Sequence, residues 1–70
     1  MNEYNFEAVW VHKAQEITVE VEITIECLDE QMAREKAFEK AMRIHKNMCA
    51  KDKEFSNTWQ YGGVHLMYTA

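Results

Sequence analysis

The clearest pattern in the chain is a strict alternation of apolar and polar residues between Ile17 and Cys27. The odd-numbered positions are aliphatic and end in the cysteine, whereas the even-numbered positions are Thr18, Glu20, Glu22, Thr24 and Glu26. Successive side chains of a β-strand point to opposite faces of the sheet. The segment is therefore predicted to be a long strand with one apolar face and one acidic face.

A second strand is predicted from Asn2 to His12, where the large aromatic residues share one parity. The short polar link from Lys13 to Glu16 would join the two strands as an antiparallel hairpin. We expect Trp10 to face Val19, because a slip of one residue would place Glu7 on the apolar face. The same register pairs Phe6 with Ile23, leaves Ala14 and Gln15 as the loop, sets Lys13 opposite Glu16, and places Val9 and Val11 beside Glu20 and Thr18 on the outer face.

A helix is predicted to follow Asp29, whose carboxylate is suited to cap the first turn, and to end near Ala50. Its apolar side is marked by residues spaced three and four apart. This inward stripe comprises Ala33, Ala37, Phe38, Ala41, Ile44, His45 and Met48. The row of alanines within the stripe should let the helix axis approach the sheet closely.

The last predicted element runs from Thr58 to Ala70, after a polar connection over residues 51–57, and contains the pair Gly62 and Gly63. Two strand-like runs separated by Gly-Gly are typical of a hairpin, which we slightly favour, although a β-bulge within one long strand would also fit. Both alternatives place the same side chains on one face, namely Trp59, Tyr61, Val64, Leu66 and Tyr68.

Together these elements predict a single α+β domain over residues 1–70, in the order β-β-α-β or, with the hairpin, β-β-α-β-β. An antiparallel sheet would have the helix packed on one face. No element is left to cover the other face of the sheet.

The composition and charge of the chain limit the classes of function that are expected of it. With 47% hydrophobic and 29% charged residues the chain has the composition of a folded globular protein. Its formal net charge of -4 opposes direct binding to nucleic acid. There is no leader-like segment and no apolar run of about 20 residues, so we expect a cytoplasmic protein with reduced cysteines and no membrane contact. A domain of this size buries a marginal core, which makes a homodimer one expectation.

Metal or thiol chemistry is the less favoured interpretation. His45 and Cys49 lie four residues apart on the predicted helix, and His12 should lie near its last turn, so the three side chains are candidate zinc ligands. Cys27 is excluded because about twenty helical residues separate it from Cys49. We favour the simpler interpretation, in which these side chains pack at the edge of the core. No catalytic motif is present, so neither an enzyme nor a cofactor is expected.

The acidic face is the stronger functional candidate. Its predicted partner-binding residues are Glu7, Val9, Val11, Glu16, Glu20, Glu22 and Glu26. A merely solvated sheet face is the simpler interpretation. The functional alternative is a surface that docks on the basic, nucleic-acid-binding surface of another protein. In size and charge the chain resembles the small inhibitor proteins of bacteriophages and other mobile elements, which implies a non-enzymatic inhibitor as one form of this function.

Overall fold

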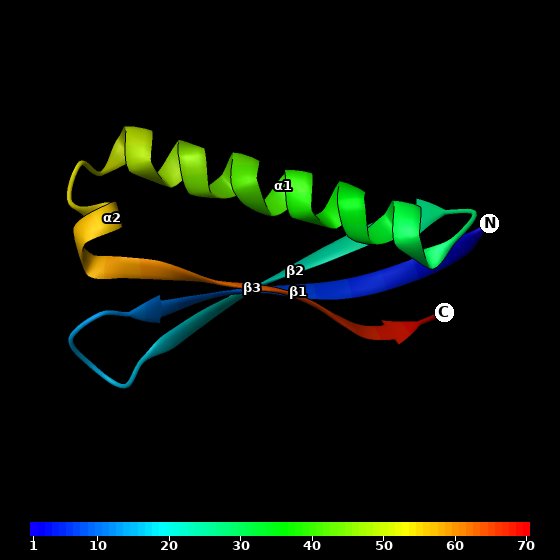
Figure 1. The fold of residues 1–70 in the computed structure, drawn as a ribbon, viewed down its shortest axis with the longest axis horizontal. Helices are drawn as coiled ribbons and strands as arrows, with labels where there is room; N and C mark the ends of the chain where they lie inside the picture. The colour runs from blue at the N-terminus through cyan, green and yellow to red at the C-terminus, as the bar shows by residue number, and fades with distance from the viewer.

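The structure of residues 1–70 is a computed structural model, and it shows a three-stranded antiparallel sheet in the order β2-β1-β3. A long helix crosses one face of this sheet and leaves the other face uncovered (Figure 1). The elements are β1 (Asn2–His12), β2 (Thr18–Cys27), α1 (Glu30–Lys51), α2 (Phe55–Thr58) and β3 (Trp59–Thr69). The predicted α+β class and the order β-β-α-β are confirmed. No helix combines the length and the apolar character that crossing a membrane requires.

The register of the first hairpin is confirmed. Trp10 pairs with Val19 and Phe6 with Ile23, without any shift along the ladder. The turn is longer than predicted, because the ladder ends at Val11 and Thr18 and does not reach a pair of Lys13 with Glu16. The side chain of His12 explains this difference, because its Nδ1 atom accepts hydrogen bonds from the Ala14 and Gln15 amides, both at 3.1 Å, and so holds these residues in the turn.

Helix α1 begins as predicted, because the Asp29 carboxylate accepts a hydrogen bond of 2.8 Å from the Met32 amide. Ala33, Ala37 and Ala41 are completely buried, which confirms the close approach of helix and sheet. Two other members of the expected inward stripe remain exposed, Phe38 at 49% and Met48 at 39%. The helix touches a narrow sheet through its alanine row, so side chains on either flank of that row extend past the region of contact.

The C-terminal segment is one bent strand, and the favoured Gly-Gly hairpin is wrong. β3 pairs with β1 along its length, and the register steps from Trp10–Tyr61 to Val9–Gly63, so Gly62 is the extra residue of a bulge. Gly63 has a φ of 114°, a conformation that residues with a side chain rarely adopt. A strand that stays paired with β1 keeps its hydrogen bonds to β1 on both sides of the glycines, which a turn at this point would not allow.

A second register shift lies between Asn5 and Phe6, where Met67 is the extra residue of β3. This shift reverses the facing of the residues that follow it. Tyr68 therefore pairs with Asn5 on the outer side and is 62% exposed, in contrast to the inward position expected for it.

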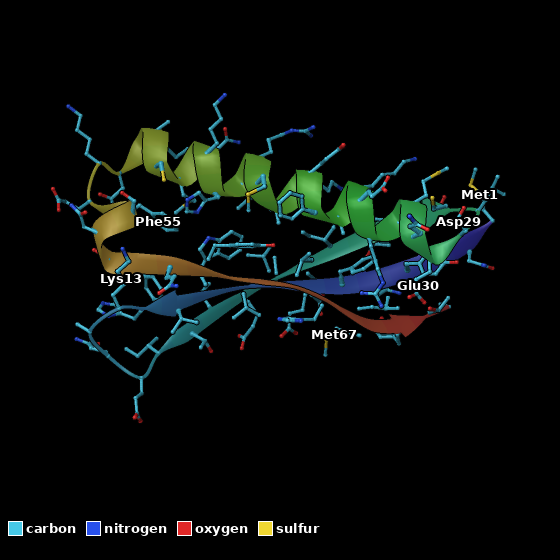
Figure 2. All side chains as sticks on the ribbon, viewed as in Figure 1. Met1, Lys13, Asp29, Glu30, Phe55 and Met67 are labelled. Carbon is cyan, nitrogen blue, oxygen red and sulfur yellow. The ribbon has the colours of Figure 1, made fainter.

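The core lies between α1 and the sheet, with the central strand β1 supplying its large aromatic side chains. Its buried members are Tyr4, Phe6, Ala8, Trp10, Ile23, Ile25, Cys27, Ala33, Ala37, Ala41 and Phe55. Phe55 comes from the segment expected to be a polar connection. It forms the start of α2 and closes the end of the core beneath the last turns of α1 (Figure 2).

Candidate protein-binding surface

The face of the sheet opposite α1 is rich in carboxylates. We define the acidic face as the outward-pointing glutamates of β1 and β2, which are Glu3, Glu7, Glu20, Glu22 and Glu26. Figure 2 shows Met67 projecting from β3 on this same side, away from the helix. Strand parity places the glutamates together, because alternate residues of the paired strands β1 and β2 share a face.

Several of these carboxylates lie directly opposite one another. The β1–β2 ladder pairs Glu3 with Glu26 and Glu7 with Glu22. Like charges at directly opposed positions of a sheet destabilise the pairing. The arrangement therefore opposes folding rather than supporting it.

No basic side chain of the sheet compensates this charge. None of the three strands contains a lysine or an arginine, and His65, which pairs with Glu7, is the only imidazole on this face. The one ion pair of the structure joins Arg34 to Glu30 on the helix, with 2.9 Å between nitrogen and oxygen. Of these carboxylates only that of Glu20 accepts a side-chain hydrogen bond, from Thr18 Oγ1 at 3.2 Å.

Apolar side chains are interspersed with the glutamates. Val11 is 38% exposed and Met67 is 57% exposed, and both point to the acidic face together with Val9. Beside Met67 lies a hollow of about 230 Å³, whose lining residues are Asn5, Phe6, Glu7, Glu22, Met67 and Tyr68. Val9 and Val11 lie toward the hairpin turn and Met67 lies toward the opposite end of β1, so the surface has an apolar group at each end, with Glu7 and Glu22 between them.

The structure brings most of the predicted surface residues together. Glu7, Val9, Val11, Glu20, Glu22 and Glu26 share the uncovered face. Glu16 does not belong to it, because the turn ends later than expected and Glu16 lies before the start of β2 at Thr18. Two residues of this surface, Glu3 and Tyr68, were not among the predicted ones. The parity of β1 could have identified Glu3, whereas the second bulge, which turns Tyr68 outward, has no marker in the sequence.

The candidate metal ligands have structural roles in this fold. Trp10 Nε1 donates a hydrogen bond of 3.0 Å to His45 Nδ1, so the neutral ring carries its proton on Nε2, which lies 3.7 Å from Cys49 Sγ. His12 binds the amides of its own turn. Nowhere do three histidine, cysteine or acidic side chains gather as a metal site would require.

The cysteines lie apart as expected. Cys27 is buried at the end of β2, Cys49 is half-buried near the end of α1, and both are free thiols. The Cys49 thiol lies beside the His45 ring. That ring is held in place by the hydrogen bond that its Nδ1 atom accepts from Trp10.

Comparison with known proteins adds nothing to this chemistry. No protein family, curated protein or solved structure matches the chain. The function has to be inferred from the acidic face itself.

Proposed function

We propose that this chain is a non-enzymatic protein-binding module whose acidic face docks on the basic, nucleic-acid-binding surface of another protein. The observation that carries the proposal is the row of glutamates in a sheet whose strands hold no lysine or arginine. Carboxylates spaced along a strand offer a basic groove the same kind of negative charge that it binds in nucleic-acid phosphates.

The energetic balance of the sheet supports a functional origin for this charge. The opposed pairs Glu3–Glu26 and Glu7–Glu22 lower the stability of a domain that has little stability to spare. A sheet face that only had to be solvated would be equally soluble with threonine or lysine at half of these positions. A basic partner would relieve the repulsion on binding.

The apolar side chains among the glutamates support direct contact rather than long-range attraction alone. Protein interfaces commonly have a buried apolar centre and a polar rim, and charges at the rim raise the rate of association. Val11 and Met67 are both exposed but lie at opposite ends of this face, so a partner would bury one apolar contact on each side of the central pair Glu7–Glu22. A partner held in this way would have its nucleic-acid-binding surface blocked, which makes the module an inhibitor.

The test is a charge reversal with a matched control. The double variant Glu20→Lys/Glu22→Lys changes the acidic face, and Glu35→Lys/Glu39→Lys makes the same change in net charge on the exposed side of α1. Partners captured from the native cell by the wild-type chain are identified by mass spectrometry. We expect the sheet variant to capture at least tenfold less of the partner than the wild-type chain does. The helix variant should capture as much as the wild type.

A second measurement tests the inhibitory role. The purified partner is mixed with labelled nucleic acid, and the wild-type chain is titrated into the complex. Displacement of the nucleic acid by the wild-type chain and by the helix variant, but not by the sheet variant, is the expected result. Equal capture of every partner by all three proteins would refute the proposal.

A further inference from the structure

The sheet has two free edges, and they differ in regularity. β3 carries two register shifts in its pairing with β1, whereas β2 pairs with β1 without any shift. Bulges twist a strand and interrupt its row of backbone groups, which is one way in which proteins protect an edge from further pairing. β2 therefore presents the regular edge of this sheet.

The residues whose backbone groups point outward from β2 can be assigned. Bonded and non-bonded pairs alternate along an antiparallel ladder. The His12 amide donates to the Ile17 carbonyl at 2.9 Å, so the odd-numbered residues of β2 bond to β1. The free amides and carbonyls belong to the even-numbered residues, which are Thr18, Glu20, Glu22, Thr24 and Glu26.

An apolar groove lies on the helix side of the same edge. Figure 1 shows the start of β2 diverging from the C-terminal half of α1. As a result Ile17 and Val19, which have the inward parity, are 46% and 44% exposed. A groove of about 220 Å³ opens here, and its lining is entirely apolar: Trp10, Val19, Val21, Ile44, Met48, Phe55 and Trp59. It is larger than a cavity of about 150 Å³ that holds a benzene molecule.

We propose that an extended segment of the partner, with aliphatic residues alternating with lysine or arginine, adds to the free edge of β2 as a fourth, antiparallel strand. Its aliphatic side chains enter the groove, and its basic side chains lie on the other face beside Glu20 and Glu22. The inference rests on the proposed function, because it assigns to the basic partner the element by which it binds. Strand addition is an established mode of peptide recognition, in which backbone bonds give affinity and side-chain pockets give specificity.

The alternating chemistry of β2 determines which strand fits. In an antiparallel arrangement the basic residues of the incoming strand stand directly opposite even-numbered residues of β2, including Glu20 and Glu22, and exchange both backbone hydrogen bonds with them. The opposite charges of such a pair favour the contact. Shifting the incoming strand by one residue would place its basic side chains in the apolar groove, so the register is defined by both faces.

A second copy of the chain is a poorer occupant of this edge. In a two-fold symmetric pairing of β2 with itself that keeps both sheets in one layer, even-numbered residues stand opposite even-numbered residues. Every even-numbered residue from 18 to 26 is a glutamate or a threonine. No register of this dimer places a cation beside the carboxylates.

The probe for this inference is the blocked synthetic peptide Lys-Val-Lys-Ile-Lys-Val-Lys, titrated into the intact protein by calorimetry. Two matched peptides carry two backbone N-methyl groups each, either on the two inner lysines or on the two valines. In the proposed geometry only the lysine amides face β2. We expect methylation of the lysines to weaken binding at least tenfold and methylation of the valines to change it less than threefold.

Amide hydrogen exchange of the protein gives an independent readout. Bound peptide should slow exchange at Glu20 and Glu22 at least tenfold, because their free amides become bonded. The variant Val19→Lys, at a half-exposed position, should fold normally and bind the peptide at least tenfold more weakly, since it places a cation in the groove.

Three results would overturn strand addition. These are equal binding of both methylated peptides, no binding of the unmodified peptide, and a protein that is already dimeric with the Glu20 and Glu22 amides protected. Each leaves the charge-reversal experiment on the native partner unaffected. Failure of strand addition is therefore distinguishable from failure of the proposed function.

Discussion

Replacement of Gly63 by alanine tests the bulge that sets the facing of the last strand. The residue has a φ of 114°, and an L-residue held in such a conformation costs roughly 1–3 kcal/mol. A Cβ atom at this position would lie 3.4 Å from the His65 ring, which is ordinary contact, so backbone strain is the main effect. For a domain of this size each kcal/mol lowers the melting temperature by about 4–8 °C. We expect Gly63→Ala to melt roughly 4–24 °C below the wild type, as measured by circular dichroism with urea unfolding alongside.

The mirror-image substitution is the matched control. D-alanine prefers positive φ, so Gly63→D-Ala, introduced by chemical synthesis, should keep wild-type stability or gain about 0.4–1 kcal/mol from a less flexible unfolded chain. Gly62→Ala differs in mechanism, because its Cβ would lie 3.3 Å from the Val9 carbonyl oxygen while its φ is not positive. Equal melting temperatures for the two enantiomers of alanine at position 63 would refute the argument.

Three further predictions concern the core and the side chains that pack against it. Phe6→Ala should lower the unfolding free energy by about 3–5 kcal/mol, because Phe6 is only 2% exposed, and a urea titration that shows less than 1 kcal/mol would contradict its central place. His45→Phe keeps a ring against Trp10 but removes the acceptor of the 3.0 Å bond from the indole, so a loss of about 1–3 kcal/mol is expected in the same assay; an unchanged midpoint would show that the bond adds no stability. Burial raises the pKa of Tyr61 above its ordinary 10.0, so the folded state holds this proton more tightly than the unfolded state; stability should fall as the pH rises above about 10, and Tyr61→Phe should remove that share of the loss in urea midpoints measured up to about pH 11.

The first hairpin and the helix could be predicted because their sequence patterns and their structure have the same period. The alternation from Ile17 to Cys27 excludes a slip of one residue against β1, and together with the short link between the strands it predicted the register that is observed. The alanine row and Asp29 likewise predict the packed side and the start of α1. In each case a wrong assignment would have buried a charge or left an amide without a partner.

The C-terminal third was harder to predict, because the alternation of side chains between the two faces of the sheet is interrupted twice within one strand. The bulges at Gly62 and Met67 each move later residues to the opposite face, and only the first has a glycine to mark it. The burial of Phe55 depends on a short helix that the polar residues around it do not indicate. The exposure of Ile17 and Val19 could not be predicted either, because it depends on how the twist of the sheet and the direction of α1 combine.

The regular edge of β2 and the glutamates on its outer face have a common explanation in the proposed strand addition. An unprotected edge of alternating valine and isoleucine residues would pair with copies of itself, and carboxylates are among the charges that prevent such pairing. On β2 they also select what can pair, since they repel a second copy and attract a strand with basic residues at the matching positions. The β3 edge has no aspartate, glutamate, lysine or arginine and is protected by bulges instead. Because attraction between exposed charges is screened by salt, whereas the backbone bonds and the groove are not, affinity for a basic strand should weaken with salt without vanishing. A partner bound through charge alone would be released completely.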